Sequence, residues 1–192
     1  WRRGQLRSEG TLEELVSRES AFLLSNLLFV GLAAAVLLGT VFPTLSQIVT
    51  GTSIALGQAF FARVSRPLSL AMLLLLGICP LLGWQRGGKL RASLPVPFAA
   101  GLVTALALAI GARMREPLAL VAFGLIALVA AAIVQEFVRG VWARHRVTGE
   151  APWLALGNLF RKNRRRYGGY LVHLAVVFMA LGITGEGLYK VE

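Results

Sequence analysis

Five long apolar runs constrain this chain more than any other feature of its sequence. They approach or exceed the length of about 18–20 residues that an α-helix needs to cross the hydrocarbon core of a bilayer. Hydrophobic residues make up 56% of the 192 residues, and charged residues make up 15%. No alternation of apolar and polar residues persists over these runs, which argues against a membrane β-barrel. The sequence therefore predicts an all-α, polytopic membrane protein.

The limits of the predicted spans follow from the apolar runs and from the prolines near helix starts. We place five transmembrane helices at residues 21–42, 67–84, 94–112, 118–138 and 168–188. Pro43 is expected to end the first span, and Pro80 is expected to kink the second. Residues 44–66 are predicted to form a loop along the outer membrane surface. Residues 139–167 are predicted to form a basic cytoplasmic loop.

The basic residues predict the orientation of these spans. The net charge is +11, and 15 of the 20 Lys and Arg residues fall in the N-terminal stretch and in the connections after the second and fourth spans. Cytoplasmic connections carry such an excess, so we expect a cytoplasmic N-terminus and a periplasmic C-terminus. Because topology accounts for the charge, no nucleic-acid partner is expected. We interpret the chain as a single membrane domain segment, 1–192, of a longer protein.

One histidine, His173, lies inside the last predicted span. An ionisable residue in a transmembrane helix is costly and marks a candidate functional site. Imidazole is also a common axial ligand of haem iron. Position alone leaves three alternatives open for His173: a haem ligand, a member of a proton path, or a structural residue hydrogen-bonded near the interface. The only other histidine, His145, lies in the basic loop, so a bis-histidine haem site needs a ligand from outside this chain.

Glu136, near the end of the fourth span, lies at the predicted membrane level of His173, and two further candidates lie just before the fifth span. Glu136 is a candidate to orient a ligating histidine or to contact a quinol; the alternative is an ion pair with Arg139 at i, i+3. The basic run 161–166 is expected to contact anionic lipid headgroups, at about 1 kcal/mol per basic residue. Within and beside that run, Arg166 and Tyr167 are candidates for contact with haem propionates.

Three segments resemble CcmF-type cytochrome c maturation proteins (the CcmF/CycK family). They read SRESAFLLSNLLFVGLAAAVLLGTVFP at 17–43, QEFVRG at 135–140 and NRRRYGGYLVHLAVVFMALGITG at 163–185. The similarity spans nearly the whole chain, and its most specific part is the block YGGYLVHL. The family's tryptophan-rich segment and its partner transmembrane histidine have no counterpart here. The resemblance therefore identifies the chain with the C-terminal half of such proteins, and the chain is not expected to be catalytically complete by itself.

The resemblance implies a subunit of the cytochrome c haem lyase in the bacterial cytoplasmic (inner) membrane. Such a subunit takes part in haem delivery, haem reduction and covalent attachment of haem to the CxxCH motif of apocytochrome c. The family carries a transmembrane haem b held by two histidines, and His173 matches the later one; quinol is the implied electron donor. Implied partners are a haem chaperone of the CcmE type, apocytochrome c and maturation subunits of the CcmH type. The alternative is a transport or scaffold protein that binds lipid or quinone, with His173 in a proton path.

Overall fold

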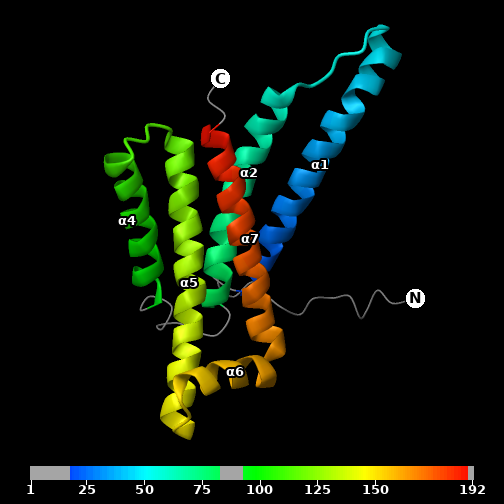
Figure 1. The fold of residues 1–192 in the computed structure, drawn as a ribbon. Coiled ribbons are helices and arrows are strands. Elements are labelled where there is room, and N and C mark those ends of the chain that lie inside the picture. The colour runs from blue at the N-terminus through cyan, green and yellow to red at the C-terminus, as the bar shows by residue number, and fades with distance from the viewer. Residues whose placement is uncertain (1–17, 83–92, 190–192) are drawn as a thin grey trace, which may run out of the picture. The chain divides into compact units, whose positions relative to one another are not determined.

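The computed structural model describes residues 18–82 and 93–189, and within these ranges it contains six α-helices and no strand. The helices are α1 (Arg18–Thr50), α2 (Gln58–Leu82), α4 (Pro95–Gly111), α5 (Pro117–Thr148), α6 (Pro152–Lys162) and α7 (Arg164–Tyr189), as Figure 1 shows. The predicted all-α class is therefore confirmed.

Four of these helices are long and apolar enough to cross a membrane. The candidate spans are Ser20–Thr50, Gln58–Ile78, Pro117–Thr148 and Arg164–Glu186. Helix α4 is also apolar but has 17 residues, which corresponds to a length of about 25 Å at 1.5 Å per residue. Many large apolar side chains on these helices are exposed on the surface of the chain. Such a surface is typical of helices that face lipid. These helices confirm a polytopic membrane protein, and the orientation of its termini stays a prediction.

Helix α1 continues past Pro43, where the sequence predicts its end, and stops at Thr50. Proline removes one backbone donor, so the carbonyl of Gly39 lacks its usual i+4 partner, a loss that membrane helices tolerate. Ser46 donates a hydrogen bond to the carbonyl of Pro43 (2.8 Å) and accepts one from the backbone N–H of Ile54 (2.9 Å). Gly51 then ends the helix in the left-handed region, with φ 72°. Only residues 51–57 of the predicted loop 44–66 lie outside helices.

Most of the predicted basic loop 139–167 is helical as well. Helix α5 continues to Thr148 and ends at Gly149, whose φ of 67° is typical of a left-handed C-terminal cap. Helix α6 buries Ala155 and Leu159, half-buries Asn158 and Phe160, and exposes its other residues. The loop prediction followed the charged residues of this segment, whereas the apolar residues at these two positions pack into the core and stabilise a helix there.

Glu150 holds the connection between α5 and α6. Its carboxylate accepts hydrogen bonds from Arg144 Nε (2.7 Å), Arg144 Nη2 (3.0 Å) and Asn158 Nδ2 (3.2 Å). The hydrogen bonds from Arg144 and then from Asn158 are the main causes that lower the pKa of Glu150 from its ordinary value of 4.5 to about 2. Glu150 is therefore ionised at neutral pH, and this ion pair fixes the turn that leads into α6.

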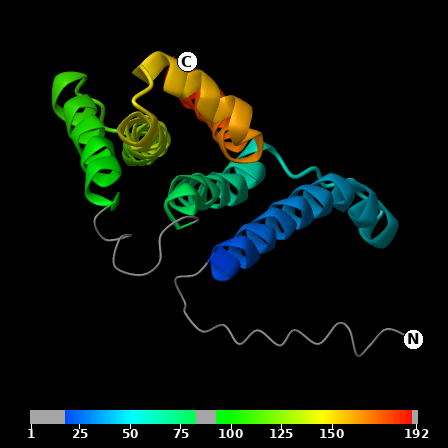
Figure 2. The ribbon, with the colours of Figure 1, turned by 90° about the horizontal axis from the view of Figure 1, so that it is seen from below.

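Residues up to Leu68 and residues from Ser69 onwards form two compact units, and α2 runs from the first into the second. In the first unit, Gly39 of α1 lies so close to α2 that a Cβ placed there would be 2.6 Å from the ring of Phe61. In the second unit, α5 contacts α4, α6 and α7. Figure 2 shows α6 running from the end of α5 to the start of α7. The core of this unit contains Ile126, Val129, Ile133, Leu159, Tyr167, Tyr170 and Val177.

Two glycines let α4 and α5 approach each other closely. A Cβ placed on Gly101 would be 2.7 Å from the carbonyl oxygen of Gly124, and one placed on Gly124 would be 3.2 Å from the carbonyl oxygen of Gly101. Small residues at such crossings allow helix backbones to pack tightly in membranes.

We expect Gly101→Ala to lower the free energy of unfolding by up to about 2 kcal/mol. Overpacking costs about 1–3 kcal/mol, and the better helix propensity of alanine offsets about 1 kcal/mol of it. The measurement is the apparent melting temperature of the purified intact protein in detergent. Gly111→Ala is the matched control, because a Cβ on Gly111 of the same helix meets no atom within 4 Å. Equal melting temperatures for both variants would contradict the packing described here.

Candidate functional site: a buried ion network and His173

Glu136 is the most deeply buried charged residue in the described structure, with 3% of its surface exposed. Its Oε2 lies 2.6 Å from Nη2 of Arg166, and its Oε1 lies 3.7 Å from Nη1 of Arg139. The i, i+3 pair with Arg139 that the sequence offered as an alternative is thus present, but the closer partner is Arg166 on α7. A buried carboxylate is tolerated when cations and hydrogen bonds compensate it. Glu136 therefore ties α5 to α7.

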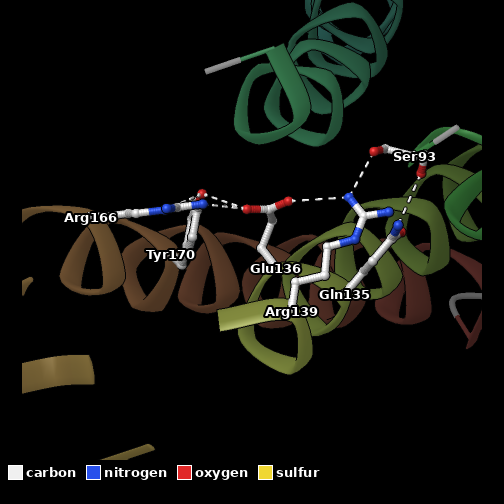
Figure 3. A network of polar contacts seen from close by, with 6 residues as sticks. All are labelled: Ser93, Gln135, Glu136, Arg139, Arg166 and Tyr170. Atoms are coloured by element: carbon white, nitrogen blue, oxygen red, sulfur yellow. Dashed lines mark hydrogen bonds and ion pairs between the residues drawn. The ribbon is translucent and has the colours of Figure 1, made fainter. Parts of the chain in front are cut away.

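Tyr170 completes the α7 side of this arrangement (Figure 3). Its hydroxyl donates to Glu136 Oε2 (3.4 Å) and accepts a hydrogen bond from Nε of Arg166 (3.3 Å). Arg166 and Tyr170 are four residues apart, so they lie on one face of the helix. Tyr170 was not predicted from the sequence, although its spacing of four residues from Arg166 was a usable signal.

On the other side, the contacts reach the start of α4. Arg139 Nη1 donates to Ser93 Oγ at 2.7 Å, and Gln135 Nε2 donates to the carbonyl of Ser93 at 3.2 Å. Figure 3 shows the six residues together: Ser93, Gln135, Glu136, Arg139, Arg166 and Tyr170. We call this set the Glu136 network. It joins α5 to α7 and to the segment that enters α4, so it fixes how three parts of the second unit pack.

An aromatic cluster lies beside the Glu136 network. Tyr167 is 2% exposed, and its ring centroid lies 5.3 Å from that of Phe137, 5.8 Å from that of Tyr170 and 6.1 Å from that of Phe160. A Cβ on Gly140 would overlap the hydroxyl of Tyr167, so this glycine leaves room for the tyrosine. In the described structure Tyr167 is therefore a core residue.

His173 lies two helical turns after Arg166 on α7 and is half-buried. Its Nδ1 is 2.9 Å from the carbonyl oxygen of Gly169. A carbonyl oxygen only accepts hydrogen bonds, so Nδ1 carries a proton, and in the neutral imidazole the lone pair is on Nε2. A hydrogen bond at one ring nitrogen orients a histidine and fixes the tautomer that binds metal through the other. The donor set therefore fits an iron ligand that binds through Nε2.

The helix face beside His173 is open and apolar. Gly169 and Val176 share this face with His173, because they precede and follow it by four and three residues. A Cβ on Gly169 would meet no atom within 4 Å, and Val176 is 38% exposed. A planar apolar group can approach the imidazole along this surface.

In the described part of the chain, Glu136 and His173 share no hydrogen bond or ion pair. The hydrogen bonds and ion pairs of Glu136 go to Arg139, Arg166 and Tyr170, whereas that of His173 goes to Gly169. Direct orientation of His173 by Glu136 thus has no geometric support here. His145 lies in the last turn of α5, with Nδ1 2.7 Å from the backbone carbonyl of Glu150. The suggested quinol contact of Glu136 and propionate contacts of Arg166 and Tyr167 stay predictions.

Comparison with curated proteins finds relatives along nearly the whole chain. The cytochrome c-type biogenesis protein ccl1 of Rhodobacter capsulatus is 31% identical over 191 residues, which cover 97% of this chain and 27% of that protein. The cytochrome c-type biogenesis protein CycK of Rhizobium meliloti is 29% identical over 92% of this chain and 26% of its own length. The cytochrome c-type biogenesis protein CcmF of Escherichia coli is 38% identical over 49% of this chain and 15% of its own length.

This chain is a homologue of the CcmF, CycK and Ccl1 biogenesis proteins. It matches the C-terminal part of these proteins. The chain spans about a quarter of the length of the Rhodobacter capsulatus and Rhizobium meliloti proteins. The resemblance to the CcmF/CycK family is therefore confirmed. No family model matches the chain, and no solved structure matches it.

Proposed function

We propose that the chain is part of a CcmF-type membrane protein of cytochrome c maturation, and that His173 is one axial ligand of a haem b. The observation that carries the proposal is the geometry of His173, which keeps Nε2 available within an apolar candidate span. The homologues are cytochrome c-type biogenesis proteins, which supports a role in the same process. The second axial ligand comes from outside this chain.

Each residue near His173 has a task in this proposal. The carbonyl of Gly169 holds the proton on Nδ1 and sets the ring orientation. The open face at Gly169 and Val176 provides apolar surface that excludes water. The Glu136 network holds α7 against α5, and it thereby fixes the depth of His173 in the membrane. Bound haem supplies one-electron redox chemistry, and Arg166 and Tyr167 remain candidates for contact with its propionates.

The intact protein has a wider proposed role. It acts as a subunit of the haem lyase in the bacterial inner membrane and takes part in haem delivery, haem reduction and haem attachment to CxxCH of apocytochrome c. Quinol is the proposed electron donor. The proposed partners are a haem chaperone of the CcmE type, apocytochrome c and subunits of the CcmH type. These assignments rest on the family resemblance, which the homologues support at the level of cytochrome c biogenesis.

The test is a pyridine haemochrome assay on the purified intact protein, together with a reduced-minus-oxidised spectrum. The proposal expects a b-type haem that stays with the protein through purification. A protein that folds and restores cytochrome c maturation in cells but carries no haem would overturn the haem assignment and favour a scaffold role.

A further inference from the structure

Among residues 18–82 and 93–189, two arginines at the corner between α6 and α7 have no acidic partner. Of the basic run 161–166, Arg166 is held by Glu136. Arg161 and Arg164 are exposed, and neither forms a hydrogen bond or an ion pair with any residue in 18–82 or 93–189. Within the described structure, both guanidinium groups thus have unused donors and an uncompensated charge.

These two arginines line one open pocket with a volume of about 380 Å³. The other lining residues are Gly157 and Phe160 of α6 and Gly168 of α7. A Cβ on either glycine would meet no atom within 4 Å, so the missing side chains leave the pocket open. The ring of Phe160 is fixed by Phe137, whose centroid lies 5.5 Å away. The pocket therefore combines two cations with a rigid apolar wall.

The surroundings of the pocket are typical of a membrane surface. The candidate span of α7 begins at Arg164, so the pocket lies where the chain enters the apolar region. Just before it, α6 exposes Trp153 (75%) and Leu154 (57%). Exposed tryptophan beside basic residues on a short amphipathic helix is a common arrangement at the level of lipid headgroups.

We propose that this pocket binds the phosphate of an anionic phospholipid such as phosphatidylglycerol. Guanidinium groups bind phosphate oxygens through paired, charge-assisted hydrogen bonds. The phosphate lies between Arg161 and Arg164, and the apolar part of the lipid lies toward Phe160. This arrangement makes the pocket a defined lipid site rather than a diffuse basic surface, and it does not depend on haem binding by His173.

The experiment measures spin-labelled phosphatidylglycerol and phosphatidylcholine bound to the intact protein in nanodiscs. We expect Arg161→Gln/Arg164→Gln to bind phosphatidylglycerol about 100-fold more weakly, from roughly tenfold for the charge-assisted hydrogen bonds of each arginine. The matched control is Arg146→Gln/Arg165→Gln, which removes the same charge from exposed positions outside the pocket. If phosphatidylglycerol binding weakens equally in both double variants, the proposal is overturned, because the overall positive charge of this surface then explains the binding.

A second variant tests the pocket at constant charge. Gly157→Leu places a side chain in the open volume while both arginines remain, and leucine is a better helix former than glycine. We expect a similar loss of phosphatidylglycerol binding, and unchanged binding would overturn the pocket assignment. Titration with inorganic phosphate distinguishes a lipid headgroup from free phosphate as the anion that the pocket binds. Release of the lipid by low-millimolar phosphate would assign the pocket to a free anion and overturn the lipid assignment.

Discussion

Replacing His173 with alanine is expected to remove the b-type haem from the intact protein. The imidazole Nε2 is the proposed iron donor, and α7 contains no other histidine that could replace it. Loss of a residue that merely orients a metal ligand weakens binding by roughly 10–100-fold, and loss of the ligand itself costs more. The b-type absorbance per polypeptide in the pyridine haemochrome assay should therefore fall at least tenfold, while the helical content measured by circular dichroism stays the same.

His145→Ala is the control for this experiment. His145 is the only other histidine of the chain, and its Nδ1 lies 2.7 Å from the backbone carbonyl of Glu150, outside the site around His173. This variant should keep the wild-type spectrum. A third variant, His173→Gly, should regain haem when imidazole is added, because free imidazole can occupy the space of the side chain. A b-type spectrum that is unchanged in His173→Ala would place the ligand elsewhere.

Removing the charge of Arg166 is expected to have the largest effect on stability. Arg166→Ala leaves Glu136, which is 3% exposed, without its closest cation. Breaking a buried ion pair by deleting one partner costs about 3–5 kcal/mol. We expect about 3 kcal/mol, because Arg139 remains 3.7 Å from the carboxylate and one quarter of the Arg166 side chain is exposed. The apparent melting temperature of the purified protein should fall accordingly.

A double-mutant cycle separates the ion pair from general damage. The cycle uses Glu136→Gln, Arg166→Ala and their combination, and the combined variant, which removes both charges, should be more stable than Arg166→Ala, which leaves a buried charge uncompensated. Arg165→Ala is the matched control, since Arg165 precedes Arg166 and is exposed. Its effect should stay within about 0.5 kcal/mol. If Arg166→Ala and Arg165→Ala have the same apparent melting temperature, the Glu136 network does not hold α5 against α7.

Part of the site was predictable because it depends on single residues and on contacts within one helix. His173 stands alone as an ionisable side chain in an apolar run, and its hydrogen bond to Gly169 stays within one helical turn. The Glu136–Arg139 pair was also predictable from the i, i+3 spacing. Helix α6 was not predicted, because its basic residues resemble those of a cytoplasmic loop and only Ala155 and Leu159 mark its buried face.

The sequence by itself determined the all-α membrane class, most of the apolar spans, the candidate histidine and the relation to CcmF-type proteins. Each of these depends on the length, composition or order of residues along one segment. Only the tertiary structure decided that Arg166, thirty residues after Glu136, is its closest partner. It also decided that Arg161 and Arg164 share a pocket with Gly168. Contacts at such separations depend on how α5, α6 and α7 pack, and the pattern of any single helix leaves that packing open.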